Sequence, residues 1–344
     1  MDITQLLTFT VQQDASDLHL SAGLPPTIRV DGDIRHLDMD PLSHKEVLDL
    51  IQDIMTDAQR ARYEENLEHD FSFGVPNLGN FRVNVFNQSR GAGAVFRAIP
   101  TEIATLEDLN APKVFREFAE KKRGLVLVTG PTGSGKSTTL AAMIDHKNRN
   151  EMGHILTLED PIEFVHEPQQ SVLNQREVGR DTYSYAAALR SALREDPDSI
   201  LVGELRDVET IRLALTAAET GHLVFGTLHT SSAAKTIDRI IDVFPGSEKE
   251  MVRTMLSESL VTVIAQSLLK KKGGGRCAAH EIMVGTPAIK NLIREGKVAQ
   301  MYSAMQTGQS VGMQTRDQGL KQLVRDGMVE KEEAALHATQ PDAI

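Results

Sequence analysis

The sequence feature that most constrains this chain is a glycine-rich octapeptide, Gly130-Pro131-Thr132-Gly133-Ser134-Gly135-Lys136-Ser137. It reads glycine, four free positions, then Gly-Lys-Ser, a spacing that lets backbone N–H groups converge on phosphate oxygens. In such a loop the lysine reaches the β- and γ-phosphates, and the serine hydroxyl ligates Mg²⁺. The octapeptide, with Thr138 directly after it, therefore predicts a binding site for a nucleoside triphosphate and Mg²⁺.

The residues on either side of the octapeptide support this interpretation. The apolar run 125–128 is typical of a buried parallel strand. Residues 138–147 are typical of a helix, whose N-terminus would point its positive dipole end at the phosphates. A glycine-rich surface turn is the alternative, and this strand and helix disfavour it.

Composition excludes several classes of protein. The 344 residues allow two or three domains, and the formal net charge of −11 argues against a chain that grips nucleic acid mainly through its phosphates. Cys277 is the only cysteine, which excludes an intramolecular disulfide and a multi-cysteine zinc module. The N-terminus has no secretory signal pattern, and the apolar run 259–269 is too short to span a bilayer. We therefore expect a cytoplasmic protein with no direct membrane insertion, which meets the membrane only through a partner.

Residues 1–100 are typical of a mixed α/β domain. Asp31-Gly32 predicts a two-residue hairpin turn. Ser43 with Glu46 predicts a capping box that opens a helix. Apolar residues alternate through 81–86, as in a strand with one buried face.

The rest of the chain has a different organisation. Residues 101–112 are polar and end in proline, which predicts a linker, and residues 113–285 alternate strand and helix as in a parallel sheet covered on both faces. Residues 286–344 are typical of several short helices. The candidate strands are 125–129, 154–158, 199–203 and 223–228, and the candidate helices are 137–148, 184–194, 208–220 and 248–269.

Carboxylates follow two of these predicted strands. Glu204 comes at the end of the apolar strand 199–203, where parallel sheets gather ligand groups and an acid can hold Mg²⁺ directly or through water. Glu159, Asp160 and Glu163 follow the strand 154–158. Three carboxylates beside a triphosphate would repel it unless Mg²⁺ or a proton-transfer role compensates. We expect one of them to orient the attacking water, and a solvated acidic loop is the alternative.

Two further pairs of side chains remain ambiguous from the residues alone. His222 and His229 bracket the predicted strand 223–228, and seven positions apart they would face opposite sides of a strand, which disfavours a shared metal ion. His229, at the carboxyl end, is the better placed to hydrogen-bond a γ-phosphate. Arg82 and Arg97 lie on or beside predicted strands, where solvated surface charge is the simplest interpretation.

Taken together, these segments resemble the secretion ATPases. The octapeptide, residues 159–163, residues 202–204 and residues 220–230 match, in order, the Walker A, aspartate, Walker B and histidine boxes of that family. Residues 16–20 and 288–295 also resemble the branch that retracts type IV pili and drives twitching motility. The resemblance covers essentially the whole chain.

The resemblance implies a homohexameric ATP-hydrolysing ring. Each subunit would have a PAS-like N-terminal domain (1–100), the linker, a RecA-like ATPase core (113–285) and a helical C-terminal region (286–344). It implies an inner-membrane pilus platform protein as a partner, and an accessory retraction ATPase as a possible one, with no nucleic acid. The implied roles are phosphate and Mg²⁺ ligands for Lys136 and Ser137, the Walker B acid for Glu204, the general base for Glu163, nucleotide-coupled conformational change for His222 and His229, and phosphate contacts for Arg82 and Arg97.

One departure and several alternatives accompany this resemblance. The retraction motif ordinarily reads Ala-Ile-Arg-Asn-Leu-Ile-Arg-Glu, and Lys290 stands where its first arginine would be, which keeps the charge but not a bidentate fork. A pilus-extension ATPase and a retraction-accessory paralogue are related alternatives. A RecA-like nucleic-acid translocase has little support, because the chain has no tryptophan and only four tyrosines for base stacking. A non-enzymatic nucleotide-gated scaffold would require Glu163 and Glu204 to be missing.

Overall fold

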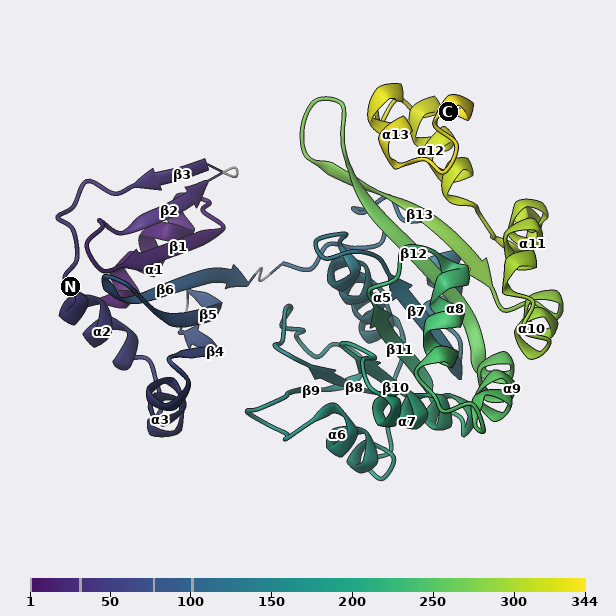
Figure 1. Ribbon diagram of the computed structural model, residues 1–344, viewed down its shortest axis with the longest axis horizontal. Coiled ribbons are helices and arrows are strands. Elements are labelled where there is room, and N and C mark those ends of the chain that lie inside the picture. The colour runs from purple at the N-terminus through teal and green to yellow at the C-terminus, as the bar shows by residue number, and fades with distance from the viewer. Residues whose placement is uncertain (1, 31–32, 77, 100–101) are drawn as a thin grey trace. The chain divides into compact units, whose positions relative to one another are not determined.

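A computed structural model describes residues 2–30, 33–76, 78–99 and 102–344. The chain divides into two compact units, Met1–Glu102 and Ile103–Ile344. Each unit has its own buried apolar core, and Figure 1 shows the helices and strands of both.

The described residues of the N-terminal unit form a six-stranded antiparallel sheet of order β3-β2-β1-β6-β5-β4. Its strands are β1 (Asp17–Ser21), β2 (Thr27–Val30), β3 (Asp33–His36), β4 (Glu68–Val75), β5 (Gly79–Gln88) and β6 (Gly91–Ile99). Its helices are α1 (Ile3–Gln12), α2 (His44–Gln52) and α3 (Asp57–Asn66).

Local sequence patterns account for much of this unit. In β5 the alternate residues Phe81, Val83 and Val85 are buried in the core, which confirms the predicted one-sided strand. The predicted capping box opens α2: Ser43 Oγ accepts from the backbone N–H of Glu46, and the Glu46 carboxylate accepts from that of Ser43. The predicted turn Asp31-Gly32 lies outside the described residues, although the flanking strands β2 and β3 do pair as a hairpin.

The second unit contains a seven-stranded sheet of order β13-β12-β7-β11-β10-β8-β9. All neighbouring strands are parallel except β13, which runs antiparallel to β12. The strands are β7 (Gly124–Thr129), β8 (His154–Glu159), β9 (Val172–Glu177), β10 (Ser199–Val202), β11 (Leu223–Leu228), β12 (Leu260–Lys270) and β13 (Arg276–Val284). The helices around them are α4 (Val114–Ala119), α5 (Lys136–Asn150), α6 (Tyr185–Ala192), α7 (Val208–Glu219), α8 (Ala233–Asp242) and α9 (Lys249–Ser259).

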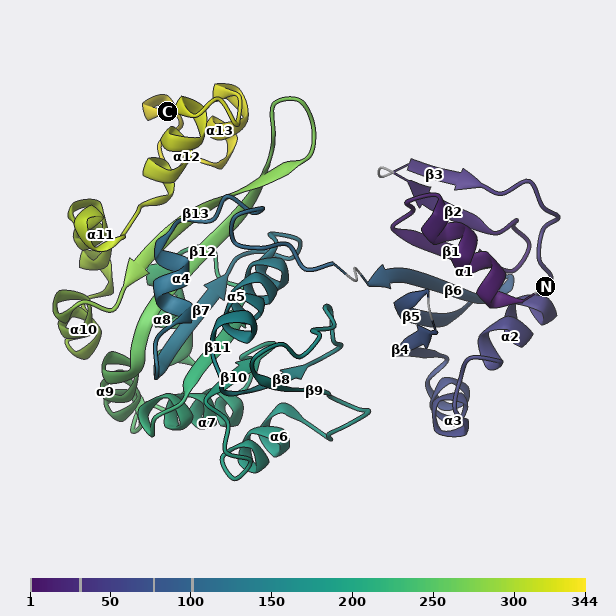
Figure 2. The same cartoon turned by 180° about the vertical axis from the view of Figure 1, so that it is seen from behind.

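Both faces of this sheet are buried, because its strands send alternate side chains into two cores. In β7, Leu125 and Leu127 pack with residues of α6 to α9, whereas Val126 and Val128 pack with residues of α4 and α5. Figure 1 shows the side of the sheet covered by α6, α7 and α8, and Figure 2 brings α4 and α5 to the front. The fold class is therefore the predicted one, and the four predicted strands are all present in it.

The predicted helix 248–269 is wrong in its second half. Helix α9 ends at Ser259, and residues 260–270 form strand β12, which pairs with β7 on one side and β13 on the other. The residues Val261, Thr262, Val263 and Ile264 are β-branched and favour a strand once sheet partners are available. Strands β9 and β13 and helices α4 and α8 were not predicted individually.

The last region and the expected linker complete the second unit. As predicted, the chain after β13 forms short helices: α10 (Pro287–Arg294), α11 (Met301–Thr307), α12 (Arg316–Arg325) and α13 (Lys331–His337), with three 3₁₀ turns. Residues 103–112, expected as linker, fold with the second unit, and the Leu106 side chain is buried in its core. Among the described ranges, no helix is long and apolar enough to cross a bilayer.

Candidate functional site

The predicted site residues follow adjacent parallel strands. The octapeptide begins directly after β7, His229 follows β11, Glu204 lies two residues after β10, and Glu159 is the last residue of β8. These strands are neighbours in the order β7-β11-β10-β8, so their carboxyl ends lie side by side at one end of the sheet, which is called the strand edge below. This edge is where doubly wound sheets bind ligands.

The octapeptide has the backbone of a phosphate loop leading into a helix. Gly135, the residue before α5, has φ 85°, and Gly130 has φ 145°, both conformations that favour glycine. A Cβ on Gly130 would lie 2.3 Å from the backbone oxygen of Gln266, so a side chain there would displace the loop. The N–H groups at the start of α5 are left to face an anion.

Lys136 is a buried cation that the loop itself holds in place. Its Nζ donates to the backbone oxygens of Gly130 and Pro131, both at 3.0 Å. Burial lowers the pKa of Lys136, and the negative charges of Glu204 and Glu163 oppose that shift, which places both carboxylates within electrostatic reach of the ammonium. The Ser134 hydroxyl is buried and has no hydrogen-bond partner among the described residues. A buried cation beside an unsatisfied hydroxyl fits a phosphate group.

Gln266 is a positioning residue that the sequence did not reveal. From β12 its Nε2 donates to the backbone oxygen of Ser134 at 2.6 Å, and its Oε1 accepts from the Thr139 hydroxyl at 2.9 Å. One buried side chain thus fixes both the loop and the first turn of α5. Sequence analysis predicts a helix over 248–269, and a helix there would not place residue 266 next to β7. The contact of Gln266 with the loop therefore could not be predicted.

Glu204 is the acid at the centre of the strand edge. Its Oε1 lies 3.0 Å from Arg206 Nε and 3.4 Å from His229 Nε2. The structure therefore brings Glu204 next to His229, with Lys136 within electrostatic reach of Glu204.

The acidic segment after β8 contains carboxylates in different environments. Glu159 is partly buried, and burial raises its pKa even though it accepts hydrogen bonds from Thr157 Oγ1 at 2.7 Å and Gln175 Nε2 at 3.2 Å. The backbone N–H of Glu163 reaches Glu159 Oε2 at 3.4 Å, while the Glu163 side chain is exposed. Glu159 therefore organises the segment, whereas Asp160 and Glu163 are exposed to solvent.

Tyr185, the first residue of α6, is a second side chain that sequence analysis missed. Burial raises the pKa of its phenol, and the carboxylates of Asp160, Glu159 and Glu204 raise it further, so the phenol stays protonated beside these acids. A Cβ on Gly203 would lie 3.0 Å from its hydroxyl oxygen, which explains why the residue before Glu204 is small. No local pattern marks this tyrosine, because it enters the site from a separate helix.

His222 does not join this group. It precedes β11 at the amino end of the strand, whereas His229 follows the carboxyl end, and six residues of parallel strand span roughly 20 Å. Its Nδ1 lies 3.0 Å from the backbone oxygen of Ala217 at the end of α7.

A cavity of about 430 Å³ adjoins the phosphate loop. It lies between the 108–111 segment, the start of α5 and the β12–β13 hairpin, and Thr138 and Gln266 line it. His280 on its wall is buried against the ring of Phe115, at 5.0 Å between ring centroids, and burial lowers the pKa of His280 to about 4. The imidazole is therefore neutral at physiological pH.

The two predicted arginines of the N-terminal unit are direct neighbours. Arg97 on β6 lies opposite Arg82 on β5, and on its other side opposite Asp17 on β1. Arg97 Nε donates to Asp17 Oδ1 at 2.9 Å, yet 67% of the Arg97 side chain remains exposed. The Asp17 carboxylate thus orients a guanidinium whose remaining donors face solvent.

The fold and the loop define this chain as a phosphate-loop nucleotide-binding protein with a parallel sheet that gathers its lysine, acids and histidine at one edge. The chain belongs to the family of Type II/IV secretion system proteins, which matches residues 1–336. It is 68% identical over 342 residues to the type IV pilus retraction ATPase PilT of Pseudomonas aeruginosa, with 99% of each chain covered. It is 57% identical over 343 residues to a twitching motility protein of Neisseria gonorrhoeae, covering 99% of this chain and 91% of that protein.

A solved structure is similar over the full length. The crystal structure of a pilus retraction motor PilT with bound ADP has a TM-score of 0.93 and 48% sequence identity, covering 100% of this chain and 99% of the other.

Proposed function

We propose that this chain is the ATP-hydrolysing motor of type IV pilus retraction, which works as a homohexameric ring and drives twitching motility. The observation that carries the proposal is Lys136, a buried ammonium in a phosphate loop with Glu204 and Glu163 both within electrostatic reach. Its relatives named as a retraction ATPase and a twitching motility protein match 99% of this chain, which supports the choice of motor.

The residues of the strand edge divide the chemistry of ATP hydrolysis between them. Lys136 would exchange its two carbonyl contacts for β- and γ-phosphate oxygens, where its charge stabilises the transition state. Ser137 and Glu204 would hold Mg²⁺, which neutralises phosphate charge when bound. Glu163 is exposed and would accept the proton of the attacking water as general base.

Glu204 also supplies a route from nucleotide state to conformation. Its carboxylate is shared with Arg206, at the start of the segment leading to α7, and with His229, in the segment leading to α8. If Glu204 bound a metal ion, its contacts with Arg206 and His229 would weaken. His222 lies at the opposite end of β11, so any coupling by this residue would act through that strand.

The remaining parts of the nucleotide have proposed sites as well. The 430 Å³ cavity beside Thr138 has a volume suited to the base and sugar of ATP. We further propose that Arg82 and Arg97 supply guanidinium donors to the phosphates. Arg97→Ala should then lower ATPase activity with rings intact, whereas Arg35→Ala, which removes another exposed arginine from the same sheet, should not.

The proposed partners follow from the motor role. The ring would act at the cytoplasmic side of the inner membrane on a pilus platform protein, and could work beside an accessory retraction ATPase. The chain would then reach the membrane through the platform protein.

The deciding experiment combines turnover with a cell phenotype. Purified wild type should hydrolyse ATP in the presence of Mg²⁺, and Lys136→Ala or Glu204→Ala should lower the rate by about 10²-fold or more. Lys331→Ala, which removes an exposed lysine from α13, is the matched control and should keep full turnover. A strain lacking the chain should stop twitching and accumulate surface pili, and only active variants should restore it.

Each alternative predicts a different result. Loss of surface pili on deletion would identify an extension motor. Stimulation of the ATPase by nucleic acid would identify a translocase, and ring assembly without hydrolysis a scaffold. Full turnover in Lys136→Ala would refute the phosphate-loop assignment.

A further inference from the structure

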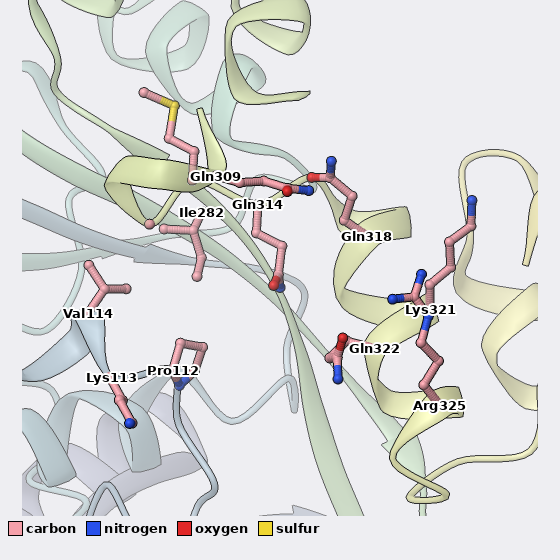
Figure 3. Close-up of a pocket in the computed structure, with 12 residues that line it drawn as sticks. Pro112, Lys113, Val114, Ile282, Gln309, Gln314, Gln318, Lys321, Gln322 and Arg325 are labelled. Carbon is pink, nitrogen blue, oxygen red and sulfur yellow. The ribbon is translucent and has the colours of Figure 1, made fainter. Parts of the chain in front are cut away.

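A second cavity, of about 450 Å³, lies between the start of α4 and the helix α12. Figure 3 shows residues 112–114 on one side of this α4–α12 pocket, the side chains of α12 on the other, and Gln314 between them. None of its lining residues borders the cavity beside the phosphate loop. Its volume lies within the range of small-molecule sites.

The pocket is positively charged in an acidic chain. Lys113 lines it from the start of α4, and Lys321 and Arg325 line it from successive turns of α12. No aspartate or glutamate is among its lining residues, although the chain has a formal net charge of −11. The pocket therefore concentrates cations in a chain whose net charge is negative.

These three cations have no carboxylate partner in the part of the chain that the structure describes. Other cations do pair, as Arg176 does with Glu195 and Lys249 with Asp242. The acid that directly follows Arg325, Asp326, accepts a hydrogen bond from Gln322 Nε2 at 2.8 Å. Positive charge in this pocket is thus left uncompensated by the protein.

The uncharged walls of the pocket are held in place by the protein. Gln314 forms a backbone bridge with Ile282, and its Nε2 donates to the backbone oxygen of His280 at 2.8 Å. The Gln318 side chain accepts from the backbone N–H of Thr315 at 2.8 Å. A preformed shape with free cations lowers the entropic cost of binding an anion.

We propose that the α4–α12 pocket binds a small anion that carries phosphoryl groups. Arg325 can form a bidentate pair with one phosphoryl group, and Lys113 and Lys321 add positive charge from the two sides of the pocket. The apolar side chains of Val114 and Ile282 leave room for an organic part of the ligand. An acidic segment of a second copy is the competing occupant, but a cavity of about 450 Å³ lies within the range of small-molecule sites.

The test is a calorimetric titration of inorganic pyrophosphate into the full chain saturated with ADP, so that the phosphate loop is already occupied. Wild type should bind one pyrophosphate per chain. The triple variant Lys113→Gln, Lys321→Gln, Arg325→Gln should bind at least about tenfold more weakly, because the pocket loses all three of its cations. A control triple variant, Lys45→Gln, Lys121→Gln, Lys331→Gln, removes the same charge from exposed lysines and should keep wild-type affinity.

Two further measurements test the fold of the variant protein and the chemical class of the anion. Arg325→Gln alone should weaken binding by a smaller factor with an unchanged melting temperature, which separates loss of the site from loss of the fold. A parallel titration with fructose 1,6-bisphosphate identifies the source of the anion: tighter binding than pyrophosphate indicates an organic phosphate, and weaker binding an inorganic one.

The proposal has clear refutations. Equal pyrophosphate affinity in the wild type and the pocket triple variant would overturn it. Absence of both pyrophosphate and sugar bisphosphate binding to the wild type would also overturn it. Failed ring assembly of the pocket triple variant would then indicate that the cations meet the acids of a second copy.

Discussion

Replacing Gln266 by methionine tests how the phosphate loop is held. The wild-type side chain makes two buried hydrogen bonds, one to the Ser134 backbone oxygen at 2.6 Å and one from the Thr139 hydroxyl at 2.9 Å. Methionine has a similar volume, so little cavity forms, but both partner groups lose their hydrogen bonds. Each buried group left unpaired costs about 1–3 kcal/mol, so with two such groups we expect the free energy of unfolding to fall by about 2–6 kcal/mol.

The same substitution should affect nucleotide chemistry. Without its bond to Gln266 the Ser134 carbonyl can shift, and a displacement of about 1 Å in a catalytic group can cost about 10²-fold in rate. We therefore expect kcat/KM for ATP to fall by about 10- to 100-fold in Gln266→Met. Urea unfolding at fixed protein concentration gives the stability, and steady-state hydrolysis with ADP calorimetry gives the functional loss.

Thr139→Val separates these two effects. It removes the bond to Gln266 Oε1 but leaves the bond from Nε2 to the Ser134 oxygen, so stability should fall by about 1–3 kcal/mol with ADP affinity unchanged. Wild-type ADP affinity and turnover in Gln266→Met would refute the positioning role.

Three other predictions follow from single features of the structure. Glu163→Gln should keep nucleotide affinity and lose turnover in calorimetry and ATPase assays, because an amide cannot accept the proton; equal loss of both would make Glu163 a structural or metal-binding residue. Arg294 lies on α10, in the segment 288–295 that resembles the retraction branch, and we expect this helix to transmit work without forming part of the ATP site. Arg294→Ala should therefore leave ATPase activity and ring assembly near normal while twitching stops and pili accumulate. Arg294 Nη1 lies 3.2 Å from Glu258 Oε1, and losing an exposed pair costs at most about 1 kcal/mol, so the fold should persist. Persistent twitching would contradict the transmission role. Burial lowers the pKa of both His166 and His280 to about 4, whereas in the unfolded chain it lies near 6.5. Between pH 6.5 and pH 4 the unfolded state therefore binds more protons, and the free energy of unfolding decreases as the pH is lowered. The loss from pH 7 to pH 5 should be about 2 kcal/mol per histidine in urea unfolding, and a His280→Leu variant that loses as much as the wild type would contradict this assignment.

The sequence alone determined the parts of the site that depend on local patterns. The spacing of Gly130, Gly135 and Lys136 encodes the loop, because glycine conformations and a helix start are properties of consecutive residues. Glu204 could be placed at the carboxyl end of a strand from its apolar run alone. The capping box at Ser43 was predictable for the same reason.

Only the tertiary structure decided which distant residues complete the site. The run 260–269 was ambiguous because a short apolar segment does not distinguish a strand from a buried helix, and its pairing with β7 and β13 made it a strand. That pairing brings Gln266 to Ser134 across 132 residues, as helix packing brings Tyr185 to the acids. Lys113 and Arg325 share a pocket for the same reason. Periodicity and motif spacing report only on neighbours along the chain, whereas burial and contact depend on which surfaces the whole chain covers when it folds.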